Sequence, residues 1–132
     1  MNNIASIILT NSSGSTTDIA VASTAVVYTK ALPLKYIDSF GLFIKATSDG
    51  VVNAKVELEQ SYKKPAAEGV ADANWVTPEG GNIILTTTDE NAHVVTISDM
   101  KVMPFFRLKI TGLGSNDVSM TISLILGIAE NL

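Results

Sequence analysis

Hydrophobic and polar residues alternate in two adjacent segments, residues 40–47 and residues 52–58, which flank an Asp-Gly pair. The apolar positions of both segments have the same parity: Phe40, Leu42, Ile44, Ala46, Val52, Ala54, Val56 and Leu58. Successive side chains of a strand point to opposite faces, so this period of two predicts strands with one buried face. Because Asp-Gly favours a tight turn, we predict that the two segments form a β-hairpin.

A second pair of alternating segments, residues 105–111 and 118–126, flanks a glycine-containing turn. Its apolar row is Phe106, Leu108, Ile110, Val118, Met120, Ile122, Leu124 and Leu126. This pair also predicts a hairpin. Apolar rows need cover from water, so we expect the two hairpins to pack face to face, with a core about 10 Å thick.

Shorter strand patterns lie outside these pairs, and no segment has a helical period. The expected short strands are residues 4–10, 19–21, 25–29, 82–88 and 93–97. Pro33 interrupts the chain before the first long segment, since proline cannot donate to a ladder. The pattern predicts one all-β domain over residues 1–132: an antiparallel β-sandwich, or jelly-roll-like fold, of about eight short strands.

Residues 61–81 have no clear periodicity. Long ordered loops in compact domains are often functional. The alternative is a two-part connection with Trp75 tucked under the edge of the sheet. The sequence leaves both interpretations open.

Composition excludes several classes of protein. Hydrophobic residues make up 46% and charged residues 17%, which suits a packed core and argues against disorder. The net charge is −4 and the nine Lys and Arg residues are scattered, so we expect no nucleic-acid partner. Without cysteine there can be no disulfide or thiolate metal site. No apolar run approaches the roughly 18 residues of a membrane span, and the first residues lack a basic signal-peptide start.

Catalytic chemistry finds little support. His93 is the single histidine, near Asp89 and Glu90, but a metal site normally needs three or four converging ligands and this acidic run is typical of a turn. A serine hydrolase centred on His93 would need a nucleophile motif that is absent. We therefore expect no enzyme activity, no cofactor and no metal.

Several large apolar residues occupy positions opposite the expected core. They are Ile4, Ile8, Phe43, Phe105, Ile125 and Ile128. Apolar residues gathered on an outer face are typical of a contact surface, and the terminal strands supply edges that another subunit can cover. We expect self-association into a homo-oligomer. The alternative is that loops of the same chain, such as residues 61–81, cover these positions.

Aromatic residues offer a second possible site. Tyr36, Tyr62 and Trp75 could form a platform for stacking sugars, as in carbohydrate-binding β-sandwich modules. The alternative is that each covers one end of the core, because only eight aromatic residues serve the whole chain.

Four segments resemble small β-sandwich structural proteins of tailed phages and prophages. They are residues 39–47 (SFGLFIKAT), 55–61 (KVELEQS), 74–76 (NWV) and 104–112 (PFFRLKITG). The chain departs from the short form of the pattern in the longer segment that carries Lys63, Lys64 and Pro65. The resemblance implies a non-catalytic virion component made in the host cytoplasm, foremost a capsid decoration (cement) protein that binds itself and the major capsid protein. The alternatives are a carbohydrate-binding module or another phage structural component of the tail or fibre.

Overall fold

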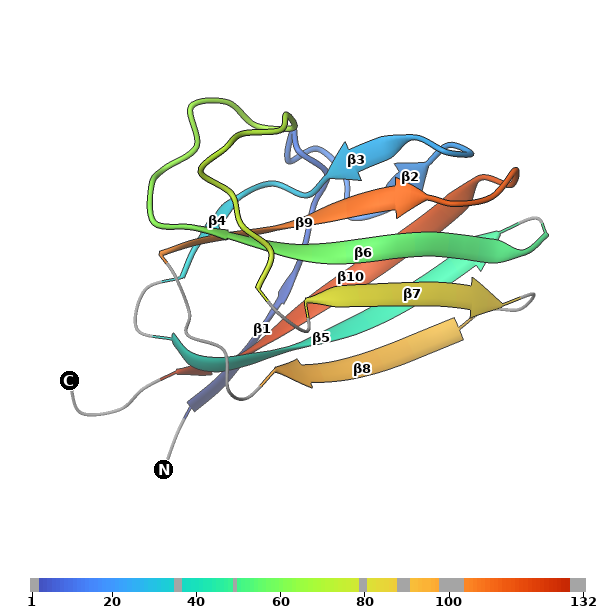
Figure 1. The fold of residues 1–132 in the computed structure, drawn as a ribbon. Coiled ribbons are helices and arrows are strands. Elements are labelled where there is room, and N and C mark those ends of the chain that lie inside the picture. The colour runs from blue at the N-terminus through green and yellow to red at the C-terminus, as the bar shows by residue number, and fades with distance from the viewer. Residues whose placement is uncertain are drawn as a thin grey trace.

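The computed structural model describes residues 3–34, 37–48, 50–78, 81–87, 91–97 and 104–128 (Figure 1). Within these ranges the chain forms ten strands. They are β1 (Asn3–Ile8), β2 (Ile19–Val21), β3 (Val26–Tyr28), β4 (Leu32–Pro33), β5 (Ile37–Ser48), β6 (Val52–Ser61), β7 (Asn82–Thr87), β8 (Asn91–Ile97), β9 (Phe105–Gly112) and β10 (Val118–Ile128).

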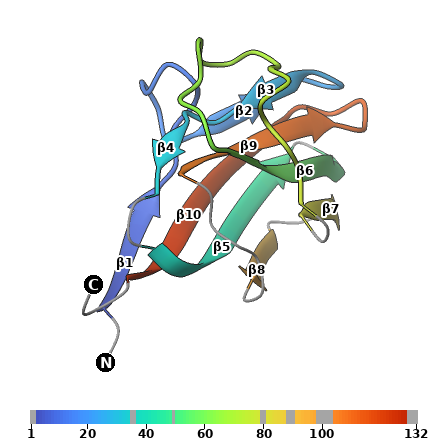
Figure 2. The ribbon, with the colours of Figure 1, turned by 60° about the vertical axis from the view of Figure 1, so that its left-hand side comes forward.

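The strands form two antiparallel sheets of five. One sheet has the order β1-β10-β5-β8, with β2 also paired to β10, and is called the β10 sheet. The other has the order β3-β9-β6-β7, with β4 also paired to β9, and is called the β9 sheet. Figures 1 and 2 show the two sheets as the layers of a sandwich. The predicted all-β antiparallel sandwich is confirmed.

Both predicted hairpins are wrong. β5 pairs with β10 and β8, whereas β6 pairs with β9 and β7. β9 and β10 likewise lie in different sheets. The connections after β5 and after β9 therefore pass from one sheet to the other. Alternation identifies the side chains that face the core, but it is the same whether the next strand joins the same sheet or the opposite one.

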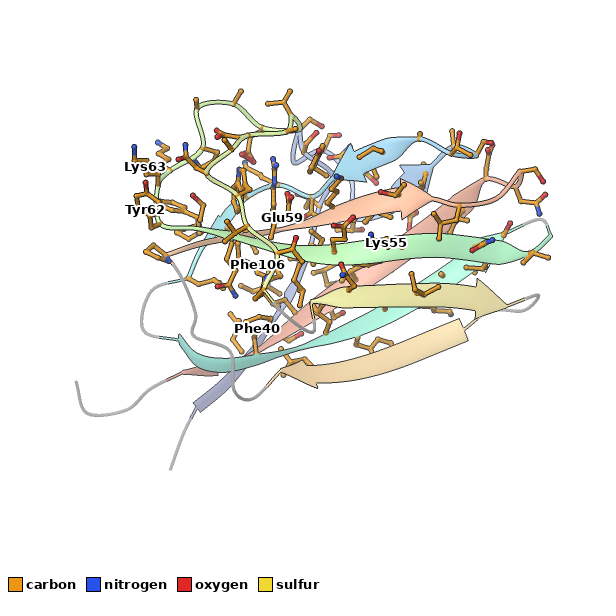
Figure 3. The ribbon with its side chains drawn as sticks, viewed as in Figure 1. Phe40, Lys55, Glu59, Tyr62, Lys63 and Phe106 are labelled. Atoms are coloured by element: carbon orange, nitrogen blue, oxygen red, sulfur yellow. The ribbon has the colours of Figure 1, made fainter. Side chains whose placement is uncertain are left out.

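The core lies between the sheets and consists of the rows that the sequence pattern predicted. All eight apolar residues of the first pair, 40–47 and 52–58, are buried, and so are the eight of the second pair. Phe40 of β5 and Phe106 of β9 meet edge to face across the core, with ring centroids 5.3 Å apart (Figure 3). The alternating rows thus face each other from opposite sheets.

Pro33 belongs to a strand, although the sequence indicated an interruption. Leu32 and Pro33 pair with Phe106 and Phe105 as β4, at the margin of the β9 sheet. An edge position tolerates proline because no neighbouring strand needs its missing N–H group. This short strand was not expected from the sequence, and it adds to a described total of ten strands, above the eight or so expected.

Gly112 closes β9 where the β2–β3 connection packs against it. A Cβ atom at this position would lie 1.7 Å from the backbone oxygen of Ser23, a residue that itself has a positive φ of 46°. The Gly112 N–H donates to the Ala25 carbonyl oxygen at 2.9 Å. Glycine is required here because any side chain would displace this backbone.

Candidate binding surfaces

The long connection between β6 and β7 returns along β6. Gln60 and Val76 exchange two backbone hydrogen bonds of 2.9 Å each, and the Leu58 N–H donates to the Gly81 carbonyl oxygen at 2.8 Å. Trp75 lies beside this contact and is only 7% exposed. Its burial agrees with the two-part connection that sequence analysis left open.

Arg107 explains how Trp75 is held. Its guanidinium lies 4.1 Å from the ring centroid of Tyr28 and 4.4 Å from that of Trp75. Its Nε donates to Glu59 Oε1 at 2.8 Å, from the neighbouring strand β6. Two cation–π contacts and an ion pair fasten the connection to the outer face of the β9 sheet.

This arginine is unusually deep for a residue on an outer face. Its side chain is 1% exposed, and its two terminal nitrogens have no hydrogen-bond partner among the described residues. The alternation of residues 105–111, with Phe106, Leu108 and Ile110 toward the core, puts Arg107 on the opposite face, where a bare sheet would leave it in water. The period of two predicts the correct face of β9 for Arg107, but it does not indicate that the β6–β7 connection covers that face.

A cleft of about 380 Å³ lies between this loop and the β4 end of the β9 sheet. Its apolar lining includes Phe105, Pro33 and Pro65, and its polar lining includes Lys30, Lys64 and Glu68. Phe105 pairs with Pro33 and Ser61 and is half-buried. Sequence analysis named Phe105, but as part of a self-association surface.

One hydrogen bond fixes the loop side of the cleft. Glu68 Oε1 accepts the Ala31 N–H at 2.7 Å, which ties the loop to the β3–β4 connection. A charged acceptor makes this bond stronger than a neutral one. The cleft is therefore bounded by two segments, about 35 residues apart in sequence, that are joined directly.

The expected aromatic platform is not assembled as an open surface. Tyr62 is 60% exposed at the end of β6, with Lys63 Nζ 5.6 Å from its ring centroid (Figure 3). Trp75 is buried, and Arg107 occupies one face of its ring. Tyr36 lies outside the described residues.

Three residues of the expected self-association surface share the outer face of the β10 sheet. Ile8 is 50% exposed, and Phe43 and Ile125 are each 38% exposed. Ser123 is paired with Ile8 on one side and with Phe43 on the other, so these two residues flank it, and Ile125 follows two positions along β10. We call Ile8, Phe43 and Ile125 the apolar patch.

The other three candidates are Phe105, Ile4 and Ile128. Phe105 lies on the other sheet, beside the loop that was expected as an alternative cover. The strands place Ile4 opposite Gly127 and Ile128 opposite Asn3, but the side chains of Ile4 and Ile128 lie outside the description. Self-association stays a prediction.

The structure bears on the metal site that was considered around His93. Among the described residues, no three His, Asp or Glu side chains gather where they could hold a metal ion. His93 is opposite Ile44 in the β5–β8 ladder, while Asp89 and Glu90 lie outside the described ranges. No helix in the described part of the chain is long and apolar enough to cross a membrane.

No family model and no curated protein matches this chain. The resemblance to phage structural proteins therefore has no support from those comparisons. Among solved structures, the chain is similar to one described as "CBM4 structure and function", with 13% sequence identity, a TM-score of 0.50, and coverage of 83% of this chain and 69% of that chain. A structure described as "Carbohydrate-Binding Module CBM36 in complex with calcium and xylotriose" matches with 11% identity, a TM-score of 0.45, and coverage of 90% and 97%. At this identity the likeness to the CBM4 structure shows a shared β-sandwich fold.

Proposed function

We propose that this chain is a non-catalytic carbohydrate-binding module and that the cleft beside Phe105 is its sugar site. The observation that carries the proposal is the cleft itself, because its lining combines apolar side chains, here called its apolar floor, with charged ones. The fold shared with the CBM4 structure supports the same assignment.

The lining of the cleft suits a pyranose ring. The C–H groups of a sugar ring pack on apolar surface, and its hydroxyl groups need hydrogen-bond partners placed around that surface. Phe105 and the two prolines offer the apolar surface, while Lys30 and Lys64 offer donors and Glu68 has a second carboxylate oxygen.

The site is held in shape before a ligand arrives. The Glu68–Ala31 hydrogen bond and the stacking of Trp75 on Arg107 fasten the loop at two points. A pre-formed site loses less conformational entropy on binding, so modest contacts can give useful affinity. This pre-formed arrangement supports recognition of a ligand.

A glycan array followed by calorimetry on the bound glycans tests the proposal. We expect selective binding, and we expect Phe105→Ala to weaken it about tenfold or more, since it removes the central apolar surface. The matched control is Phe43→Ala, a half-exposed phenylalanine on the other sheet, which should bind as the parent does. A blank array, or an unchanged profile in Phe105→Ala with an intact melting curve, would refute the assignment.

The apolar patch favours a second candidate function. It supports a virion structural protein, made in the host cytoplasm, that associates with itself and with the major capsid protein as a decoration (cement) protein, or with the tail or fibre. Repeated contacts on a capsid lattice would let a small patch act through avidity. Mass spectrometry of purified particles should then find the chain in stoichiometric amounts, and its absence would remove this candidate.

A further inference from the structure

We propose that the cleft prefers anionic saccharides, in which the pyranose carries a carboxylate or a sulfate group. This inference rests on the proposed carbohydrate-binding function and adds the class of sugar. It follows from the charges that border the cleft and from the contacts of Glu68 and Lys30.

The cleft is locally positive on a chain whose net charge is −4. Two lysines, Lys30 and Lys64, line it, and Lys63 is adjacent in sequence. The acidic residue of the lining, Glu68, already accepts the Ala31 N–H at 2.7 Å. Two cations against one carboxylate leave a positive field over the apolar floor, which attracts an anion.

The side chain of Lys30, which lines the cleft, also packs against another loop. Its Cδ and Nζ atoms would each lie 3.4 Å from a Cβ atom at Gly14, so the side chain runs closely over this glycine. Gly14 has a positive φ of 76° and leaves room for the contact. A lysine stem that rests on the backbone is already partly ordered, so it loses less side-chain entropy when an anion binds.

The ligand class follows from the combination of surface and charge. An apolar floor alone selects a ring, and lysines alone select any anion; together they select a ring that carries an acidic group. A lysine ammonium acts as a point charge without the forked geometry of arginine, so we expect little distinction between carboxylate and sulfate. Neutral sugars should bind the same floor more weakly.

Matched hexasaccharides test the preference by calorimetry at low and high salt. The pairs are β-1,4-linked glucose with glucuronate, α-1,4-linked galactose with galacturonate, and β-1,4-linked mannose with mannuronate, plus the 6-O-sulfated form of the glucose oligomer. We expect at least one acidic member to bind about tenfold more tightly than its neutral partner, with the difference shrinking as salt rises.

Two lysine variants locate the effect. In Lys30→Gln/Lys64→Gln the preference for the acidic partner should disappear, while Lys45→Gln, an exposed lysine on the other sheet, should leave it unchanged. Equal affinity for neutral and acidic partners, or a preference that survives the double substitution, would overturn the inference. Failure of this inference can be distinguished from failure of the proposed function. If neutral sugars bind equally well and Phe105→Ala abolishes that binding, the proposed sugar site stands and only the preference for acidic sugars is refuted. If no sugar binds at all, both proposals are refuted.

Discussion

The surroundings of Arg107 could not be predicted from the sequence pattern. The alternation correctly placed Arg107 on the outer face of β9. It also implied an exposed side chain, and this is wrong because Trp75 and Tyr28 cover the guanidinium. Phe105 was recognised as an apolar residue opposite the core, but the lysines that share its cleft come from distant segments. The residues were visible in the sequence. Their neighbours were not, because the loop that assembles them has no periodicity.

The Arg107–Glu59 pair should be energetically stronger than the neighbouring Lys55–Glu57 pair. The Arg107 guanidinium is buried, so Glu59→Gln removes its counter-charge, and we expect the free energy of unfolding to fall by about 3 kcal/mol. The control is Glu57→Gln, on the same face of β6, whose partner Lys55 is 35% exposed. A change there should cost less than about 1 kcal/mol.

Urea unfolding measures both effects, and a third variant tests their cause. Arg107→Met in the Glu59→Gln background should recover much of the lost stability, since it removes the unpaired charge and keeps an apolar stem in contact with the surrounding side chains. Equal losses for Glu59→Gln and Glu57→Gln, or no recovery in the double variant, would contradict this account of the pair.

At the scale of elements, strand positions and buried faces were predictable, but strand partners were not. The apolar rows of β5, β6, β9 and β10 are buried as expected. The turn residues 48–50 and 113–117 were taken as hairpin turns because glycine and aspartate favour any tight reversal. Whether such a reversal stays in one sheet depends on how the two layers stack, which the local sequence does not encode.

The loop that borders the cleft should open when its anchor is removed. Glu68→Ala deletes the acceptor for the Ala31 N–H, so we expect trypsin to cut after Lys63 about tenfold faster, with little change in melting temperature. Glu68→Gln keeps an oxygen acceptor at the same position and is the matched control. Mass spectrometry identifies the fragments, and identical cleavage rates in Glu68→Ala and the parent would argue against this anchor.

On the scale of the whole molecule, the two candidate surfaces belong to different sheets. The cleft and its loop lie at the β9 sheet, and the apolar patch lies on the outer face of the β10 sheet. Each surface can therefore be altered without touching the other. The sequence predicted the two layers and all three residues of this patch, since Ile8, Phe43 and Ile125 were expected opposite the core.

Self-association should depend on the apolar patch. Phe43→Asp or Ile125→Asp places a charge where a second copy would pack, so we expect a shift toward monomer with an unchanged melting curve. The control is Val26→Asp, which is 47% exposed on the other sheet and should not alter the oligomer. Light scattering after chromatography gives the mass. A parent that is already monomeric, or patch variants with the parent's mass, would exclude the patch as an interface.

The crossing of the chain between layers after β5 and after β9 has a consequence for how the protein folds. Among the described strands, only β6 and β7 are both consecutive in sequence and paired, and a long loop separates them. Almost every strand pair therefore forms only when distant parts of the chain meet. This raises the contact order and slows folding toward the millisecond-to-second range. Since β9 and β10 supply an inner strand to each layer and come last, a nascent chain has no finished sheet until its final third has emerged.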